Sequence, residues 1–208
     1  MLQFITHTHP SLSMETYVEQ VLQGGGRWIQ LRMKEKPIED VRQAALQLLP
    51  LCKAYKAKLI LDDHVALVSE VGADGVHLGK MDMSPLAARQ LLGNNFIIGG
   101  TANTFADVKY LFDAGVDYIG LGPYQYTDTK KNLSTILGIQ GYTEIMNAMK
   151  AENMCLPVVA IGGICSTDIP SLMCTGISGV ALSGSILKAK DIVQTTAQII
   201  DIITKNTK

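Results

Sequence analysis

Short apolar runs recur from one end of the chain to the other, and each interval leaves room for one helix. The runs are rich in Val, Ile and Leu, a composition typical of strands buried on both faces of a parallel sheet. A polar or glycine-rich break and then a helical stretch follow each run, so the pattern predicts eight strands alternating with about eight helices. The runs are Leu2–Ile5, Trp28–Leu31, Leu59–Leu61, Gly75–Leu78, Ile97–Gly99, Tyr118–Leu121, Val158–Ile161 and Gly179–Leu182.

The helical stretches begin and end with matching signals. Ser13 can cap a helix that ends at Gly24. Pro37 suits a first helical turn, and Ser84 stands directly before another proline. The last helix is expected over about 191–203, with an apolar stripe along one side. These signals support one helix between successive strands.

Two architectures fit such an alternation: a closed barrel and an open, doubly wound sheet. Near-equal repeats without an obvious switch point favour the barrel. The segments Ala73–Val76, Gly115–Ile119 and Gly176–Val180 resemble one another, and each reads as a helix end turning into a strand. We therefore predict an α/β fold, a (β/α)8 TIM barrel that forms a single catalytic domain over residues 1–208.

Composition and charge narrow the range of partners. With 18 basic and 19 acidic residues, the formal net charge is −1. This balance gives no reason to expect nucleic acid or a membrane as a partner, although a homo-oligomer stays possible. No signal peptide or membrane-spanning stretch is visible, and no cysteines form a C-x-x-C pair, so we expect a cytoplasmic protein with reduced thiols.

The active site of such a barrel lies where the strands end, which turns the sequence into a list of candidate residues. Gln30, Arg32 and Lys34 alternate along the end of the second strand and so share one side of it. They could be a solvated strand end. Two cations on one side of a buried strand are better suited to a polyanion such as diphosphate.

Carboxylates follow the third and fourth strands. Asp62 and Asp63 end one strand, and Asp82 comes shortly after the next. Neighbouring strands would bring Asp63 and Asp82 together, and Mg²⁺ prefers carboxylate and phosphate oxygens. The first two aspartates could instead cap a helix. His77, within its strand, is expected to be a hydrogen-bonded core histidine.

A long polar loop follows the sixth strand, over residues 124–138, and suggests a substrate lid. Thr127, Thr129 and Lys130 lie in it and suit a phosphate or a diphosphate leaving group. Thr101, which ends the fifth strand, could face the substrate or belong to a helix cap.

Glycine-containing turns end the seventh and eighth strands. Gly162 and Gly163 form one turn, and Ser183 and Gly184 form the other. Glycines here let backbone N–H groups point at an anion, the usual phosphate site of such barrels. Either turn alone could be structural. Their occurrence on both of these strands predicts a phosphate ligand.

Several motifs in register resemble the thiamine-phosphate synthase family. The resemblance runs in the same order from about Leu2 to Leu187. It is carried by Gln30–Lys34, Asp62-Asp63, Gly72–Gly79 with Asp82, Tyr118–Pro123 with Thr127, Thr129 and Lys130, and Val158–Ile164.

The resemblance implies a reaction and a set of roles. The family joins a hydroxymethylpyrimidine diphosphate to a thiazole phosphate, giving thiamine phosphate and diphosphate by a dissociative, Mg²⁺-dependent mechanism. It implies that Asp63 and Asp82 bind Mg²⁺. The diphosphate would be held by Gln30, Arg32, Lys34 and Lys130, and the thiazole phosphate by Thr127, Thr129, Gly162, Gly163, Ser183 and Gly184. The substrate-binding set also includes Asp62 and Thr101, and the candidate catalytic residues are Arg32, Lys34, Lys130 and Thr101.

Four positions depart from the family pattern. Asp62 stands where the family usually has Asn, and Lys80 where Gln is usual. Met33 replaces a commoner acidic residue, but its side chain should face away from the site. Asn103 replaces a histidine on which a related thiazole tautomerase relies, and that enzyme tends to lack the full diphosphate and magnesium set.

Other functions stay open on the sequence alone. A tautomerase-like role in the same barrel family is one alternative, and another phosphate-binding barrel is a second. An aldolase would need a lysine within a strand for a Schiff base, and none is apparent. A non-catalytic phosphate-binding barrel would keep the glycine turns without needing Asp63 and Asp82.

Overall fold

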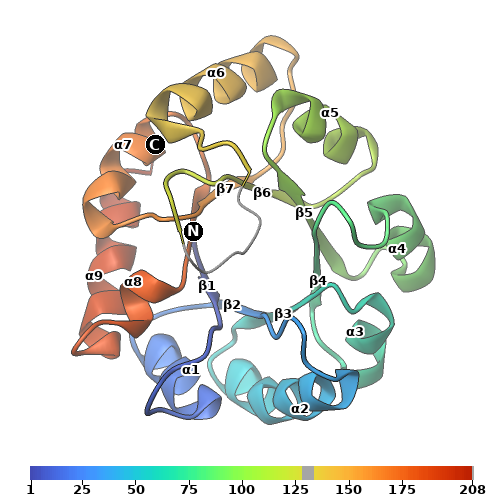
Figure 1. Ribbon diagram of the computed structural model, residues 1–208, viewed down its shortest axis with the longest axis vertical. Helices are drawn as coiled ribbons and strands as arrows, with labels where there is room; N and C mark the ends of the chain where they lie inside the picture. The colour runs from blue at the N-terminus through green and yellow to red at the C-terminus, as the bar shows by residue number, and fades with distance from the viewer. Residues whose placement is uncertain (128–133, 208) are drawn as a thin grey trace.

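Eight parallel strands form a closed barrel, in the order β1 to β8, which confirms the predicted TIM barrel (Figure 1). The computed structural model describes residues 1–127 and 134–207. Two strands run further than predicted, and the other six have the predicted bounds. The strands are β1 (Leu2–Ile5), β2 (Trp28–Leu31), β3 (Lys58–Asp62), β4 (Gly75–Leu78), β5 (Ile97–Ala102), β6 (Tyr118–Leu121), β7 (Val158–Ile161) and β8 (Gly179–Leu182).

The helices surround this ring of strands (Figure 1). They are α1 (Met14–Gln23), α2 (Ile38–Ala54), α3 (Val65–Val71), α4 (Pro85–Leu92), α5 (Phe105–Asp113), α6 (Gly138–Ala151), α7 (Ile169–Cys174), α8 (Gly184–Leu187) and α9 (Ile192–Lys205), with a 3₁₀ turn η1 (Ser166–Asp168) before α7.

Most of the residues that were predicted to begin a helix form an N-cap in the structure. The side chains of Ser13, Ser84 and Asp191 each accept a hydrogen bond from a backbone N–H in the first turn of α1, α4 and α9. Thr104 forms a capping box with Asp107 at the start of α5. The prediction for Pro37 was wrong by one position: it precedes α2 as the N-cap and lies outside the first turn.

The three similar segments at the bottom of the barrel tie neighbouring strands together. The Asp74 carboxylate accepts a hydrogen bond from the backbone N–H of Leu59 at 2.8 Å, and Asp117 does the same for Ile98 at 2.7 Å. The Ser178 hydroxyl accepts from the N–H of Val158 at 3.3 Å. The repeated motif therefore satisfies a backbone donor at the start of the preceding strand. The motif therefore contributes to the stability of the barrel.

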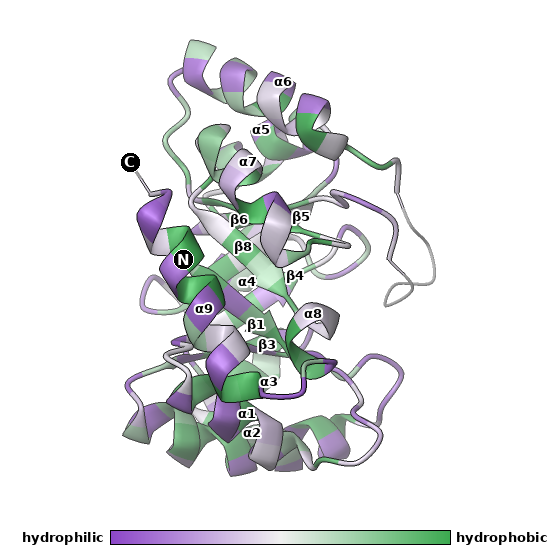
Figure 2. Ribbon diagram, turned by 90° about the vertical axis from the view of Figure 1, so that its left-hand side faces the viewer, coloured by the Kyte–Doolittle hydropathy of each residue, from purple (hydrophilic) through white to green (hydrophobic). Residues whose placement is uncertain are grey.

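Apolar packing lies mainly between the strands and the helices. Figure 2 shows apolar strands enclosed by helices on which hydrophilic and hydrophobic stretches alternate. A second, small cluster of buried apolar residues consists of Ile5, Tyr118, Val159 and Ala181. No helix in the described part of the chain is long and apolar enough to cross a membrane.

Candidate active site

A cavity of about 430 Å³ opens where the strands end, at the position expected for the site of a TIM barrel. Its wall includes residues that follow every strand of the ring. Thr129 and Lys130 lie outside the described residues. The predicted site residues on the wall are Gln30, Arg32, Lys34, Asp62, Asp63, Thr101, Thr127, Gly162, Gly163, Ser183 and Gly184.

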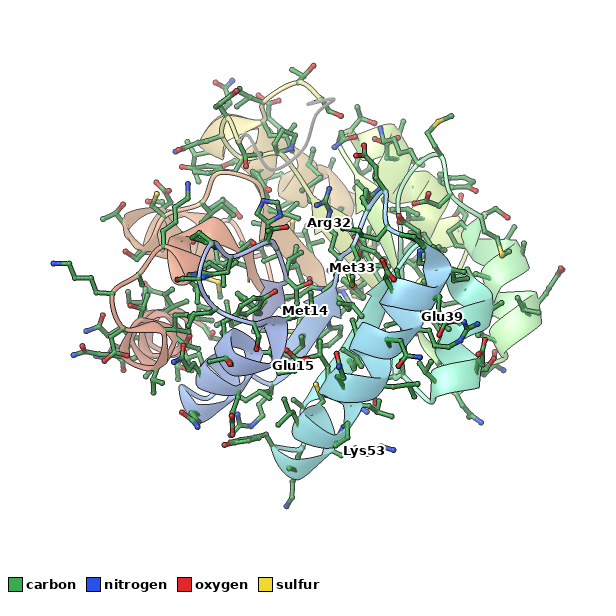
Figure 3. All side chains as sticks on the ribbon, turned by 60° about the horizontal axis from the view of Figure 1, so that its bottom comes forward. Met14, Glu15, Arg32, Met33, Glu39 and Lys53 are labelled. Atoms are coloured by element: carbon green, nitrogen blue, oxygen red, sulfur yellow. The ribbon has the colours of Figure 1, made fainter. Side chains whose placement is uncertain are left out.

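The two cations after β2 point into this cavity, and each lies beside a carboxylate. Arg32 Nε is 3.6 Å from Asp62 Oδ2, and Lys34 Nζ is 3.3 Å from Asp63 Oδ2. Met33, between them, packs against the outer apolar core, as predicted. Figure 3 labels Arg32 and Met33 where β2 ends. The alternation of side chains along the strand thus directs Arg32 and Lys34 to the cavity and Met33 to the outer core.

A chain of buried side-chain hydrogen bonds lies beneath this wall. Gln3 Nε2 donates to Gln30 Oε1 at 2.6 Å and to the Tyr118 hydroxyl at 3.0 Å. Gln30 Nε2 in turn donates to Asp62 Oδ1. Since Gln3 occupies the Gln30 oxygen, the Gln30 amide nitrogen must face Asp62. The orientation of a predicted binding residue is therefore set by Gln3, a residue that was not among the predicted ones.

His77 continues the chain towards β5. Its Nδ1 lies 3.0 Å from the Tyr118 hydroxyl, and its Nε2 lies 3.0 Å from Thr101 Oγ1. Gly99 makes room for this arrangement, because a β-carbon there would lie 2.2 Å from Tyr118 Cζ. Both ring nitrogens are occupied, so His77 is the hydrogen-bonded core histidine that we expected. Thr101 faces the cavity, while the cap of α5 is made by Thr104.

Asp63 and Asp82 meet at the ends of β3 and β4. Their carboxyl groups share a hydrogen bond, and Asp82 Oδ2 also accepts from the backbone N–H of Gly79 at 2.6 Å. Asp63 has a φ of 67°, a left-handed conformation that is uncommon outside glycine and costs free energy. The helix-cap alternative is wrong, because His64 precedes α3 and no side chain caps it.

The protonation of this pair follows from its surroundings. Burial raises the pKa of Asp63, and the hydrogen bond with Asp82 raises it further. Burial acts to raise the pKa of Asp82 as well, but the hydrogen bonds from Asp63 and Gly79 outweigh it and hold that pKa below its usual value. The pKa values of the two carboxyl groups are therefore shifted in opposite directions.

Asp62 lies deeper than this pair. Burial raises the pKa of Asp62 to about 7, and the charge of Asp63 acts in the same direction. The hydrogen bond from Gln30 and the charge of Arg32 act against the rise. One carboxylate oxygen of Asp62 accepts the hydrogen bond from Gln30 while the other lies in an ion pair with Arg32, which a neutral asparagine could not form.

The turn after β7 packs directly against the segment after β6. Gly162 and Gly163 have φ values of 97° and 68°, which favour glycine. A β-carbon at Gly163 would lie 2.5 Å from the Tyr126 carbonyl oxygen, so the approach also requires glycine. The backbone N–H of Gln125 donates to the Gly162 carbonyl at 2.9 Å. This contact places Thr127 on the cavity wall.

Asn103 contacts the segment after β6 at both of its ends. Its amide nitrogen donates to the Gly122 carbonyl, and its Oδ1 accepts from the Ser134 hydroxyl at 3.0 Å. Asn103 therefore links the end of β5 to both sides of the segment after β6. Asn103, which stands at the histidine position of the tautomerase pattern, therefore has a structural role.

The turn after β8 leaves a hydroxyl without a partner. Ser183 precedes α8 without capping it, and within the described residues its buried Oγ has no hydrogen-bond partner. Three residues that the sequence did not single out as site residues, Cys165, Ser185 and Lys188, also line the cavity. His7 lies on the cavity wall, whereas His9 Nδ1 accepts from the backbone of Leu12 and is not on it.

Comparison with known proteins decides the family. A family model described as thiamine monophosphate synthase matches residues 2–186. The chain belongs to this family. A thiamine-phosphate synthase from Bacteroides fragilis is 56% identical over 201 residues, which cover 97% of this chain and 98% of that protein. One from Phocaeicola vulgatus is 55% identical over 201 residues, 97% of each chain.

A solved structure agrees with this assignment to the thiamine monophosphate synthase family. The thiamine phosphate pyrophosphorylase from Pyrococcus furiosus superimposes with a TM-score of 0.88 at 29% identity, covering 100% of this chain and 96% of that one. The predicted family and the predicted enzyme class, a transferase, are both confirmed.

Proposed function

We propose that this member of the thiamine monophosphate synthase family condenses 4-amino-2-methyl-5-hydroxymethylpyrimidine diphosphate with 4-methyl-5-(2-hydroxyethyl)thiazole phosphate. The products are thiamine phosphate and diphosphate. One observation carries the proposal: cations and carboxylates line one side of the cavity, and the other side is lined by glycine turns and by a hydroxyl that has no partner among the described residues. A cavity built in this way suits two different phosphorylated ligands at once.

The diphosphate belongs on the side formed after β2, β3 and β4. Arg32 and Lys34 would donate charge-assisted hydrogen bonds to its oxygens, and both already project into the cavity. Gln30 and Asp62 lie beneath them, and Thr101 faces the same space. Lys130, which the resemblance places at the same group, stays part of the proposal.

Asp63 and Asp82 fit a magnesium site. Among the described residues no group of three or more His, Cys, Asp and Glu side chains surrounds a common point. A pair of carboxylates is nonetheless sufficient, since Mg²⁺ is commonly held by one or two carboxylates together with substrate phosphate oxygens. Two adjacent carboxyl groups repel each other when both are ionised, so positive charge between Asp63 and Asp82 is favoured. When bound there, Mg²⁺ would offset negative charge on the diphosphate.

The chemistry needs charge stabilisation and positioning more than a nucleophile. The bond from the pyrimidine methylene carbon to the diphosphate oxygen breaks first, and the electron pair leaves with the diphosphate. Arg32 and Lys34 stabilise the charge that grows on this leaving group, where fixed cations lower the barrier most. The thiazole nitrogen then forms its bond to the methylene carbon of the resulting pyrimidine cation. No protein side chain forms a covalent bond in this sequence.

The thiazole phosphate belongs on the side formed after β6, β7 and β8. Thr127, Ser183 and the turns at Gly162-Gly163 and Gly184 would hold its phosphate, together with Thr129. Ser183 supports this placement, because a buried hydroxyl without a partner costs free energy unless a ligand satisfies it.

The direct test is product formation from the two substrates, with Mg²⁺ and again with a chelator. Thiamine phosphate formed only in the presence of the metal is the expected result. A folded protein that gives no product in either condition would contradict the proposal. Product formed equally well with chelator would remove the metal role of Asp63 and Asp82 while leaving the reaction in place.

A further inference from the structure

Lys188 is a cation on the cavity wall that the proposed function leaves unused. It follows α8 directly, and its backbone N–H donates to the Gly184 carbonyl at 3.0 Å. The side chain extends back beside the turn, because a β-carbon at position 184 would lie 3.8 Å from Lys188 Cε. The ammonium group therefore sits beside the Ser183-Gly184 turn.

Lys188 differs from the other cations of the wall in its pairing. Arg32 and Lys34 each lie beside an aspartate, at 3.6 Å and 3.3 Å. Lys188 forms no ion pair or side-chain hydrogen bond with any described residue, although it lines the same cavity. Its positive charge is thus not neutralised by the protein in this part of the site.

The residues of the turns after β7 and β8 that line this part of the cavity are neutral. The Ser183 hydroxyl is buried and has no partner in residues 1–127 and 134–207, and Gly162, Gly163 and Gly184 contribute only backbone to the wall. A phosphate monoester carries up to two negative charges at neutral pH. Hydroxyl and backbone donors can bind its oxygens, but they bring no full positive charge. One uncompensated cation beside them supplies what is missing.

We propose that Lys188 supplies the positive charge that binds the phosphate group of the thiazole substrate. This inference rests on the proposed function for the identity of the ligand. It makes Lys188 a determinant of specificity: the residue distinguishes the phosphorylated thiazole from the corresponding free alcohol, and it contributes nothing to the pyrimidine diphosphate.

The test compares binding of thiazole phosphate and of the unphosphorylated thiazole alcohol, by calorimetry at fixed ionic strength. Lys188→Ala should raise the Kd for thiazole phosphate by about tenfold, the lower end of the range for a charged hydrogen bond, because the side chain is exposed. Lys188→Arg should restore most of the affinity. Binding of the alcohol should be the same in all proteins.

Lys190→Ala is the matched control. Lys190 is two residues away and exposed, but it lines a separate hollow with His9 and Asp191. This variant should bind thiazole phosphate as the wild-type protein does. An unchanged Kd in Lys188→Ala would overturn the inference, and so would an equal loss of affinity for the alcohol, which would show a structural effect.

Turnover measured in parallel keeps the two proposals separate. A wild-type protein that binds thiazole phosphate through Lys188 yet forms no thiamine phosphate would overturn only the proposed reaction. Normal turnover, together with a Lys188→Ala variant that binds thiazole phosphate normally, would overturn only the role of Lys188. A wild-type protein that does not bind thiazole phosphate would overturn both.

Discussion

The two sides of the cavity are built on different principles. The side after β2, β3 and β4 carries paired charges on a buried hydrogen-bond network that includes Gln3 and Tyr118. The side after β7 and β8 consists of glycine turns, one hydroxyl and one lysine, and neither of these two side chains has a polar partner in the part of the chain that the structure describes. Three strands lie between β3 and β7 in either direction around the ring, so these sides face each other across it. In the proposed arrangement, the group that leaves with its negative charge lies among fixed cations, while the phosphate that stays attached to the product lies mainly in turns shaped to hold it.

The largest expected effect comes from removing one carboxylate of the Asp63–Asp82 pair. Asp82→Ala should lower turnover by about a hundredfold or more, the scale seen when one electrostatic contributor to a transition state is lost. The fold should persist, because Asp82 is half-buried and its partners are Asp63 and the backbone of Gly79.

Circular dichroism and steady-state turnover measure these two quantities side by side. Asp201→Ala, at an exposed position of α9 that pairs with Lys205, is the matched control and should leave both unchanged. Loss of the dichroism signal in Asp82→Ala would show that the residue is structural. Asp82 would then no longer count as a proposed metal ligand on the charged side of the cavity.

A smaller effect is expected for the first cation after β2. Arg32→Ala should weaken diphosphate binding by roughly 1.5–3 kcal/mol, the value of a charge-assisted hydrogen bond. Affinity for thiazole phosphate should hardly change, since we propose that this ligand binds on the other side. Titration of each variant with diphosphate checks this, with Lys36→Ala, an exposed neighbour, as the control. Equal losses for both ligands would mean that the cavity is not divided.

The smallest of the three effects concerns the network beneath the site. Gln3→Leu removes the donor that fixes the Gln30 amide. Two buried acceptors, Gln30 Oε1 and the Tyr118 hydroxyl, then lose the hydrogen bond from Gln3. We expect a loss of about 1–3 kcal/mol in stability. We also expect kcat/KM for the pyrimidine diphosphate to fall several-fold, by up to about tenfold.

The readout that separates positioning from simple destabilisation is the second substrate. In Gln3→Leu the KM for thiazole phosphate should stay near the wild-type value at a temperature where the variant is fully folded. A parallel rise in both KM values would indicate a general loosening of the barrel and would remove Gln3 as a positioning residue.

The barrel and most of its site could be predicted because both depend on local pattern. Short apolar runs separated by caps identify the strands, and the rule that sites form where strands end then selects Arg32, Asp63 and Gly163 without any knowledge of contacts. The agreement extends to opposite sides of one strand, where Arg32 faces the cavity and Met33 faces the outer core.

What escaped prediction depends on contacts between distant residues. Gln3 is one polar residue within an apolar strand, a weak signal, and its use becomes clear only when β1, β2 and β6 are brought together. Lys188 was missed because it follows its strand by several residues, and a short helix returns its side chain to the turn. The pairing of Asp62 with both Gln30 and Arg32 likewise requires the closed ring.

The most direct measurement is calorimetric titration of the wild-type protein with diphosphate and with thiazole phosphate, each with and without Mg²⁺ and each in the presence of the other. We expect diphosphate to require Mg²⁺, thiazole phosphate to bind with or without the metal, and the two ligands to bind together. Mutually exclusive binding, or the same metal requirement for both, would contradict a cavity divided into a charged side and an anchoring side.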